Sequence, residues 1–120
     1  MEVKIATINN FEKEVLNSSK ACAVLFSSEF CHLCENLKPI FKKQADAYRD
    51  IKFFTVDTVE EDRLTEIFSS NGVPTIYFFI GGDATEIIYP EDEESGYSEE
   101  SLQTFFDAYM SGNLRIVKGK

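Results

Sequence analysis

The stretch FSSEFCHLCENLKP, from Phe26 to Pro39, places two cysteines three positions apart, where an apolar run gives way to a pattern of helical period. A close pair of this kind, here Cys31 and Cys34, serves as half of a metal site, as a structural disulfide or as a redox centre. Which of the three applies depends on the elements that surround the pair and on the other candidate ligands in the chain.

The residues on either side of the pair predict a buried strand followed by a long helix. Residues 21–26 (ACAVLF) are apolar without alternation, which is typical of a strand covered on both faces. Beyond Cys31, apolar side chains recur at helical spacing, at Leu33, Leu37, Phe41, Ala45 and Tyr48. The same reasoning predicts further strands at residues 3–8, 51–56, 75–80 and 85–89, and further helices at residues 9–19, 57–70 and 98–110.

Strands and helices therefore alternate in the order βαβαβαββα, which predicts an α/β fold. Such alternation gives parallel strands with helices on both faces of the sheet. The Gly81-Gly82-Asp83 turn between the last two strands predicts an antiparallel hairpin, so we expect a central mixed sheet. The sequence shows no internal repeat, and we expect a single domain over residues 1–112 with a short C-terminal tail at residues 113–120.

Composition narrows the classes of partner. The 120 residues are 43% hydrophobic, which is enough to bury one core. A net charge of −9 would repel nucleic acids and anionic membranes. No apolar run approaches the roughly 20 residues that a membrane-spanning helix needs, and the N-terminal residues have no basic leader. We therefore expect a monomeric, cytoplasmic protein without a nucleic-acid or membrane partner.

The other candidate ligands favour a redox role for the pair. A zinc site needs four nitrogen or sulfur ligands, and besides the pair the chain holds only Cys22, predicted mid-strand, and His32, so we expect no metal. A disulfide across three positions closes too short a loop to constrain the unfolded chain much. A helix that begins near Cys31 would instead stabilise a thiolate there. Cys31 would then attack a substrate disulfide, and Cys34 would resolve the mixed disulfide.

Three features together resemble the thioredoxin family, from roughly Val3 to Ser111: the CxxC motif after the second strand, Pro39 five residues beyond Cys34, and GVPT at residues 72–75. The resemblance implies a thioredoxin fold and a thiol–disulfide oxidoreductase that reduces or exchanges protein disulfides. It also implies an upstream thiol reductase as the electron donor, and no cofactor other than the protein's own redox-active disulfide.

The resemblance further implies a substrate groove beside the cysteines. Val73–Pro74 would be a cis peptide bond that faces the disulfide, and the backbone of Val73 would bind an incoming peptide. Phe30 keeps the aromatic character of the residue that precedes the motif, and we expect it to contact the substrate. The alternative function is a redox-inert binding module that holds a partner protein through the Pro74 groove; the intact cysteines and proline argue against it.

The chain departs from the family at several positions. Thioredoxins carry WCGPC, whereas His32 and Leu33 stand between the cysteines here, and we expect both to tune the redox potential. A His32 cation would stabilise the neighbouring thiolate. The alternative is that His32 is a surface residue with no role. The family's acid beneath the resolving cysteine and the lysine near it are replaced by Leu25 and Phe53. Glu29 is then a candidate proton acceptor through solvent.

Two more features, the third cysteine and an acidic run, say less about function. Cys22 is expected to be a small buried side chain with no chemistry, because free cysteine is among the most buried residue types. The acidic run from Glu91 to Glu94 is typical of a solvated loop. In the resembled fold, however, this loop borders the groove, so its charge would select among substrates.

Overall fold

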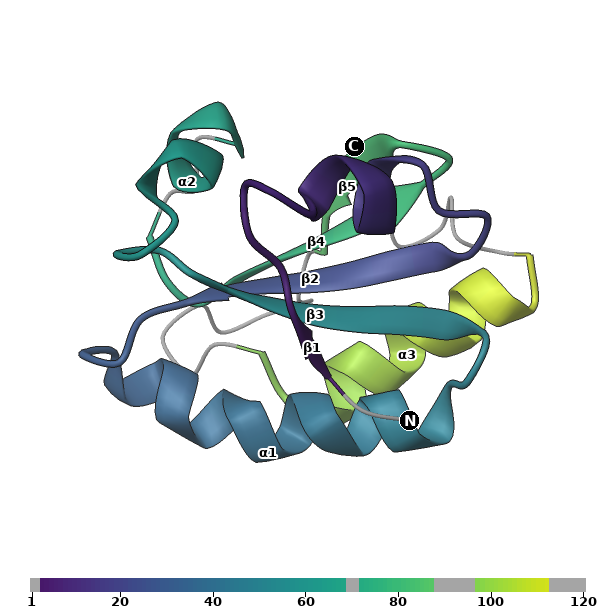
Figure 1. Cartoon of the computed structure of the whole chain (residues 1–120). Coiled ribbons are helices and arrows are strands. Elements are labelled where there is room, and N and C mark those ends of the chain that lie inside the picture. Colours follow the sequence, from purple (N-terminus) through teal and green to yellow (C-terminus); the bar gives the residue numbers. More distant parts are fainter. Residues whose placement is uncertain (1–2, 69–71, 88–96, 113–120) are drawn as a thin grey trace.

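The computed structural model describes residues 3–68, 72–87 and 97–112. These residues contain a five-stranded sheet with the strand order β1-β3-β2-β4-β5 (Figure 1). The strands are β1 (Lys4–Ile5), β2 (Ala21–Ser27), β3 (Ile51–Asp57), β4 (Thr75–Ile80) and β5 (Asp83–Glu86). Strand β3 is parallel to β1 and β2, whereas β4 is antiparallel to β2 and β5. The predicted mixed sheet with an antiparallel closing hairpin is therefore confirmed.

Helices cover both faces of this sheet. They are the π-helix η1 (Glu12–Leu16) and the α-helices α1 (His32–Ala47), α2 (Asp62–Phe68) and α3 (Glu99–Met110). In Figure 1, α1 and α3 lie below the sheet, whereas α2 and the short purple helix η1 lie above it. The predicted α/β order with helices on both faces is confirmed for the part of the chain that the structure describes.

Strand β2 is the middle strand of the sheet, and every one of its residues is buried. Its alternate side chains enter two separate cores: Leu25 packs in the core with Phe41 of α1, and Phe26 packs in the core with Leu64 of α2. A strand covered on both faces has no polar face to show. This is why residues 21–26 are continuously apolar.

The N-terminal strand is shorter than the predicted residues 3–8. The backbone N–H of Ala6 still donates to the carbonyl of Thr55 at 2.9 Å, which extends the pairing one residue beyond β1. The chain then turns, because Oδ1 of Asn10 accepts a hydrogen bond from the N–H of Thr7 at 2.8 Å. This side-chain acceptor closes a turn in place of the predicted strand end.

The helices predicted at residues 9–19 and 57–70 are also shorter than expected. Asp57 belongs to β3, and its Oδ1 accepts hydrogen bonds from the N–H groups of Val59 and Glu60 at 2.9 and 3.1 Å. An aspartate that bonds the backbone just beyond itself favours a turn over a helix. The turn therefore occupies the residues that the sequence assigned to the start of α2.

The C-terminal part has the predicted order of elements, but the turn before β5 is shorter than predicted, because Asp83 already pairs with Ile80. Strand β5 begins before the predicted residues 85–89, and the N–H of Ile87 still donates to the carbonyl of Ile76 at 2.8 Å. The acidic run at 91–94 and the tail at 113–120 lie outside the described residues, so the predicted domain boundary stays a prediction. Within the described ranges, no helix combines the length and the apolar character that crossing a bilayer requires.

Candidate active site

The cysteine pair lies at the junction of β2 and α1. In the turn between these two elements, the N–H of Cys31 donates to the carbonyl of Ser28 at 3.1 Å. Cys31 is the N-cap of α1, with an extended backbone, and its Sγ accepts a hydrogen bond from the N–H of Cys34 at 3.1 Å. The predicted start of the helix near Cys31 is confirmed. The sulfur of Cys31 accepts from one of the first-turn N–H groups that have no partner within the helix.

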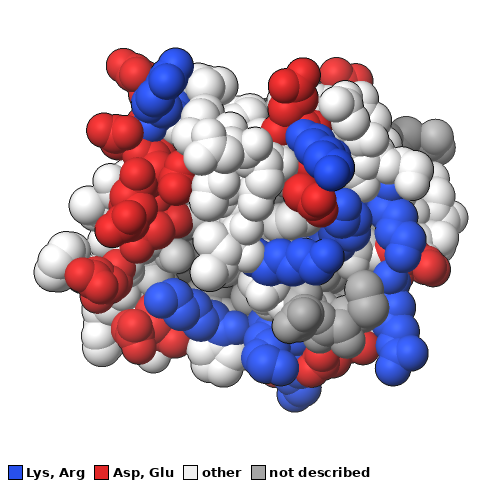
Figure 2. Space-filling view, viewed as in Figure 1, with Lys and Arg blue, Asp and Glu red and all other residues white. Residues whose placement is uncertain are grey.

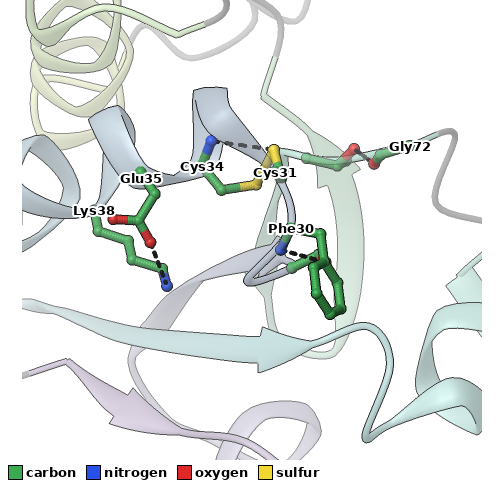
Figure 3. Close-up of a disulfide and its surroundings, with 8 residues drawn as sticks. Phe30, Cys31, Cys34, Glu35, Lys38 and Gly72 are labelled. Carbon is green, nitrogen blue, oxygen red and sulfur yellow. Dashed lines mark hydrogen bonds and ion pairs between the residues drawn. A yellow bond between two sulfur atoms is a disulfide. The ribbon is translucent and has the colours of Figure 1, made fainter.

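The two sulfur atoms differ sharply in their access to solvent. Cys31 and Cys34 form a disulfide, with their Cα atoms 5.2 Å apart (Figure 3). Cys34 has no exposed surface, whereas Cys31 is partly exposed. An incoming sulfur or a partner chain therefore meets Cys31 first. The side chains around it are open as well: Phe30 is 82% exposed, Leu33 is 37% exposed and His32 is exposed.

The segment before β4 reaches the same end of the sheet. Thr75 pairs with Phe26 in the antiparallel register of β4 and β2, so Pro74 lies at the end of β2 that leads to the cysteines. The Val73–Pro74 peptide bond is cis. The hydroxyl of Thr75 donates to the carbonyl of Gly72 at 2.6 Å, and Gly72 has a φ of +117°, a conformation that favours glycine. Figure 3 shows Gly72 on the Cys31 side of the disulfide.

A groove of about 230 Å³ runs from the cysteine motif to the start of α3. Its walls include Leu33, Asn36, Ile40, Pro74, Tyr97 and Glu99. The hydroxyl of Tyr97 accepts a hydrogen bond from the N–H of Ile76 at 3.1 Å, which holds the tyrosine ring against β4. Thus Leu33 and Pro74, both predicted as site residues, line one groove.

Sequence reasoning missed part of this groove. Asn36 and Ile40 follow Leu33 at helical spacing, so the period of α1 could have identified them. Tyr97 and Glu99 come from the other end of the chain, and no local pattern links them to the cysteines. Glu99 forms an ion pair with Lys43 of α1, with Oε2 and Nζ 2.9 Å apart, and this contact brings α3 to the groove.

The positions that hold the family's buried acid and lysine are both apolar here. Leu25 and Phe53 have 0% and 2% of their surface exposed and lie in the core with α1 and α3. Leu25 also lines a second cavity, of about 520 Å³, together with Lys38 and Asp57. Glu29 is exposed, and its role as a proton acceptor through solvent stays a prediction.

The third cysteine lies apart from the pair. Cys22 has no exposed surface and packs in the core beneath η1 and α2, on the face of the sheet opposite α1. Burial raises the pKa of its thiol. The prediction of a buried side chain is confirmed. No three His, Cys, Asp or Glu side chains of the described ranges come together as metal ligands.

Charge is distributed unevenly over the face shown in Figure 2. Acidic side chains gather on the left, where α2 and the start of α1 lie, whereas lysines and arginines gather toward the right. Glu35, in the first turn of α1, lies 4.0 Å from Lys38 and is partly neutralised by it. The cysteine end of the molecule is therefore the more acidic end of this face.

The known proteins that this chain resembles in sequence and in structure share the thioredoxin fold. The family model described as Thioredoxin matches residues 2–108. Protein disulfide-isomerase A6 from Mesocricetus auratus and that from Homo sapiens are each 32% identical over 115 residues, which cover 95% of this chain but 25% and 24% of the relatives. The chain thus spans about a quarter of the length of these curated relatives. A solved structure, Malassezia sympodialis Thioredoxin (Mala s 13), shares the fold, with a TM-score of 0.70, 24% identity and 85% of each chain covered.

These relatives contradict the prediction of a cytoplasmic protein, because protein disulfide-isomerase A6 is a protein of the endoplasmic reticulum. The prediction rested on the lack of a long apolar run and of a basic leader in the N-terminal residues. A dithiol–disulfide pair exchanges electrons with the thiols of reducing and oxidising compartments alike. The pair therefore carries no information on the compartment.

Proposed function

This chain belongs to the thioredoxin family, and we propose that it is a thiol–disulfide oxidoreductase that reduces or exchanges protein disulfides through Cys31 and Cys34. The observation that carries the proposal is the asymmetry of the pair. A partly exposed sulfur at the N-terminus of a helix is disulfide-bonded to a sulfur with no exposed surface. One sulfur can meet a large substrate, and the other can only meet its neighbour.

The reaction begins with the reduced protein. The thiolate of Cys31 attacks one sulfur of the substrate disulfide; a mixed disulfide forms, and the second substrate sulfur leaves as a thiolate. The thiolate of Cys34 then attacks Sγ of Cys31, which forms the Cys31–Cys34 disulfide and releases the first substrate sulfur. The substrate gains two electrons and two protons, and the protein is oxidised. An upstream thiol reductase returns the two electrons.

The surroundings of the pair supply the substrate contacts. Phe30 offers an exposed aromatic ring directly before Cys31. Pro74 lines the groove, and the backbone of its neighbour Val73 would hydrogen-bond the substrate chain. His32 and Leu33 set the redox potential. The reaction needs no cofactor beyond the pair itself and is carried out by a monomer.

Turnover of insulin disulfides with dithiothreitol as the electron donor tests this proposal. The wild type should accelerate the reduction, whereas Cys31→Ser should lower the rate to that of dithiothreitol alone. Cys34→Ser should accumulate a mixed disulfide between Cys31 and the substrate, visible by mass spectrometry. Equal rates for the wild type and Cys31→Ser would instead favour the redox-inert binding module.

A further inference from the structure

Among the described residues, the groove beside the cysteine pair combines apolar side chains with the carboxylate of Glu99. Leu33 lies between the two cysteines in the sequence and lines this groove, so the groove begins beside the pair. Ile40 and Pro74 extend the apolar wall, and Glu99 stands at the N-terminus of α3. A long side chain with an apolar stem and a polar end fits such a surface.

The chain itself shows which charge the carboxylate accepts. Nζ of Lys43 lies 2.9 Å from Oε2 of Glu99, so an ammonium group already sits on this side chain. The side chains of Lys43 and Glu99 are 67% and 39% exposed, so the pair can rearrange. A carboxylate offers about four acceptor positions, and one ion pair leaves room for a second donor.

We propose that this groove selects a lysine or arginine side chain close to the reactive cysteine of the substrate. The aliphatic stem lies against Leu33, Ile40 and Pro74, and the cationic end pairs with Glu99. This specificity rests on the proposed oxidoreductase function and adds a substrate class to it.

The groove distinguishes basic, uncharged and acidic substrate side chains by their charge. An uncharged side chain of the same length would keep the apolar contacts but would give Glu99 no partner. A glutamate would meet repulsion from Glu99 at this position. Lys43 competes for the same carboxylate, so its removal should strengthen the selection rather than weaken it.

Reduction of three matched peptide disulfides tests the proposal. The peptides carry lysine, norleucine or glutamate next to one cysteine and are otherwise identical. We expect kcat/KM of the wild type to be highest for lysine, up to about five-fold above norleucine, as for an exposed ion pair, and lowest for glutamate. Glu99→Gln should bring the lysine-to-norleucine ratio close to one, and Lys43→Gln should raise it above the wild-type value.

Glu100→Gln is the matched control. Glu100 is exposed in the same turn of α3 and carries the same charge, so its removal changes the general field of the protein without touching the groove. Glu100→Gln should keep the wild-type ratio. Equal rates for the three peptides, or an equal loss of the ratio in both glutamine variants, would overturn the proposal. Absence of reduction for all three peptides would overturn the proposed function as well, so the two failures are distinguishable.

Discussion

The backbone N–H of Cys34 donates a hydrogen bond to Sγ of Cys31 at 3.1 Å, at the first turn of α1. When the disulfide is reduced, this sulfur remains beside free N–H groups and the positive end of the helix dipole, and both stabilise a negative charge. Cys34 is the third residue of α1 and has no exposed surface. The two thiols of the reduced protein should therefore differ in ionisation and in access.

We predict that iodoacetamide modifies Cys31 first, with a pH midpoint below the value of about 8.5 for a free cysteine. The measurement is the alkylation rate of the reduced protein as a function of pH, with the modified site identified by mass spectrometry. Cys22 serves as an internal control, because its burial should keep it unmodified while the protein is folded. A first modification at Cys34, or a midpoint at or above the free value, would refute this assignment.

The strands that build the centre of the sheet could be predicted from the sequence almost to the residue. Residues 21–26, 51–56 and 75–80 were predicted, and β2, β3 and β4 cover Ala21–Ser27, Ile51–Asp57 and Thr75–Ile80. The continuous apolar run of β2 reflects burial on both faces, and β3 and β4 are apolar at most positions, which a local pattern records. The N-terminal strand and helix were predicted too long, because the turn at Asn10 depends on one side-chain hydrogen bond rather than on apolar spacing.

The site could be predicted only in part, for a related reason. Cys31, Leu33 and Pro74 belong to motifs that can be read along the chain, and the structure brings them together. Glu99 joins the groove because α3 packs against α1, and Tyr97 joins it because its hydroxyl bonds the backbone of β4. Such contacts between distant segments leave no period or spacing in the sequence.

Gln44 provides a prediction about stability. It is 1% exposed, and neither its amide nitrogen nor its amide oxygen has a hydrogen-bond partner among the described residues. A buried polar group without a partner costs about 1–3 kcal/mol. Gln44→Leu should therefore raise the free energy of unfolding by about 1–2 kcal/mol in urea denaturation. Gln103→Leu, at an exposed position of α3, should change it little. A destabilised Gln44→Leu protein would show that the amide has a partner in solution.

Tyr48 gives a prediction about alkaline pH. Its hydroxyl donates to Oδ1 of Asp107 at 2.5 Å and so ties the end of α1 to α3. Burial, and then the bond to Asp107, raise the pKa of Tyr48 from 10.0 to about 12. Because the folded-state pKa is the higher one, the protonated phenol stabilises the fold fully below pH 10, and this contribution disappears as the pH rises toward 12.

The measurement is the urea midpoint of the wild type beside Tyr48→Phe, at pH 8 and at about pH 11.5. The phenylalanine variant lacks the titrating group, so the lysines that also titrate in this range affect both proteins alike. The advantage of the wild type should shrink between the two pH values. An advantage that stays constant would mean that the Tyr48–Asp107 bond does not control the ionisation of the phenol.

The last prediction concerns the redox potential and follows from the two residues between the cysteines. Both are exposed in the first turn of α1, so they act on the pair without forming part of the core. We expect His32 to stabilise the reduced form, because a partial positive charge on its imidazole would attract the Cys31 thiolate, whereas the disulfide carries no charge. Leu33 replaces the proline that in thioredoxins helps to hold a reducing potential, so we expect both residues to raise the potential.

Glu29 and Glu35 act against this shift, because their negative charges repel a thiolate. Glu35, however, is partly neutralised by Lys38, 4.0 Å away, so the net change should be upward. Thioredoxin has a potential near −270 mV, and we expect a value tens of millivolts higher, equivalent to about 1 to 2 kcal/mol. The test is a glutathione redox titration of the wild type beside His32→Gly and Leu33→Pro; proline is tolerated in the first turn of a helix. Both variants should move the potential downward. A wild-type potential at or below about −270 mV, or variants that move upward, would show that these two residues do not act on the pair in this way.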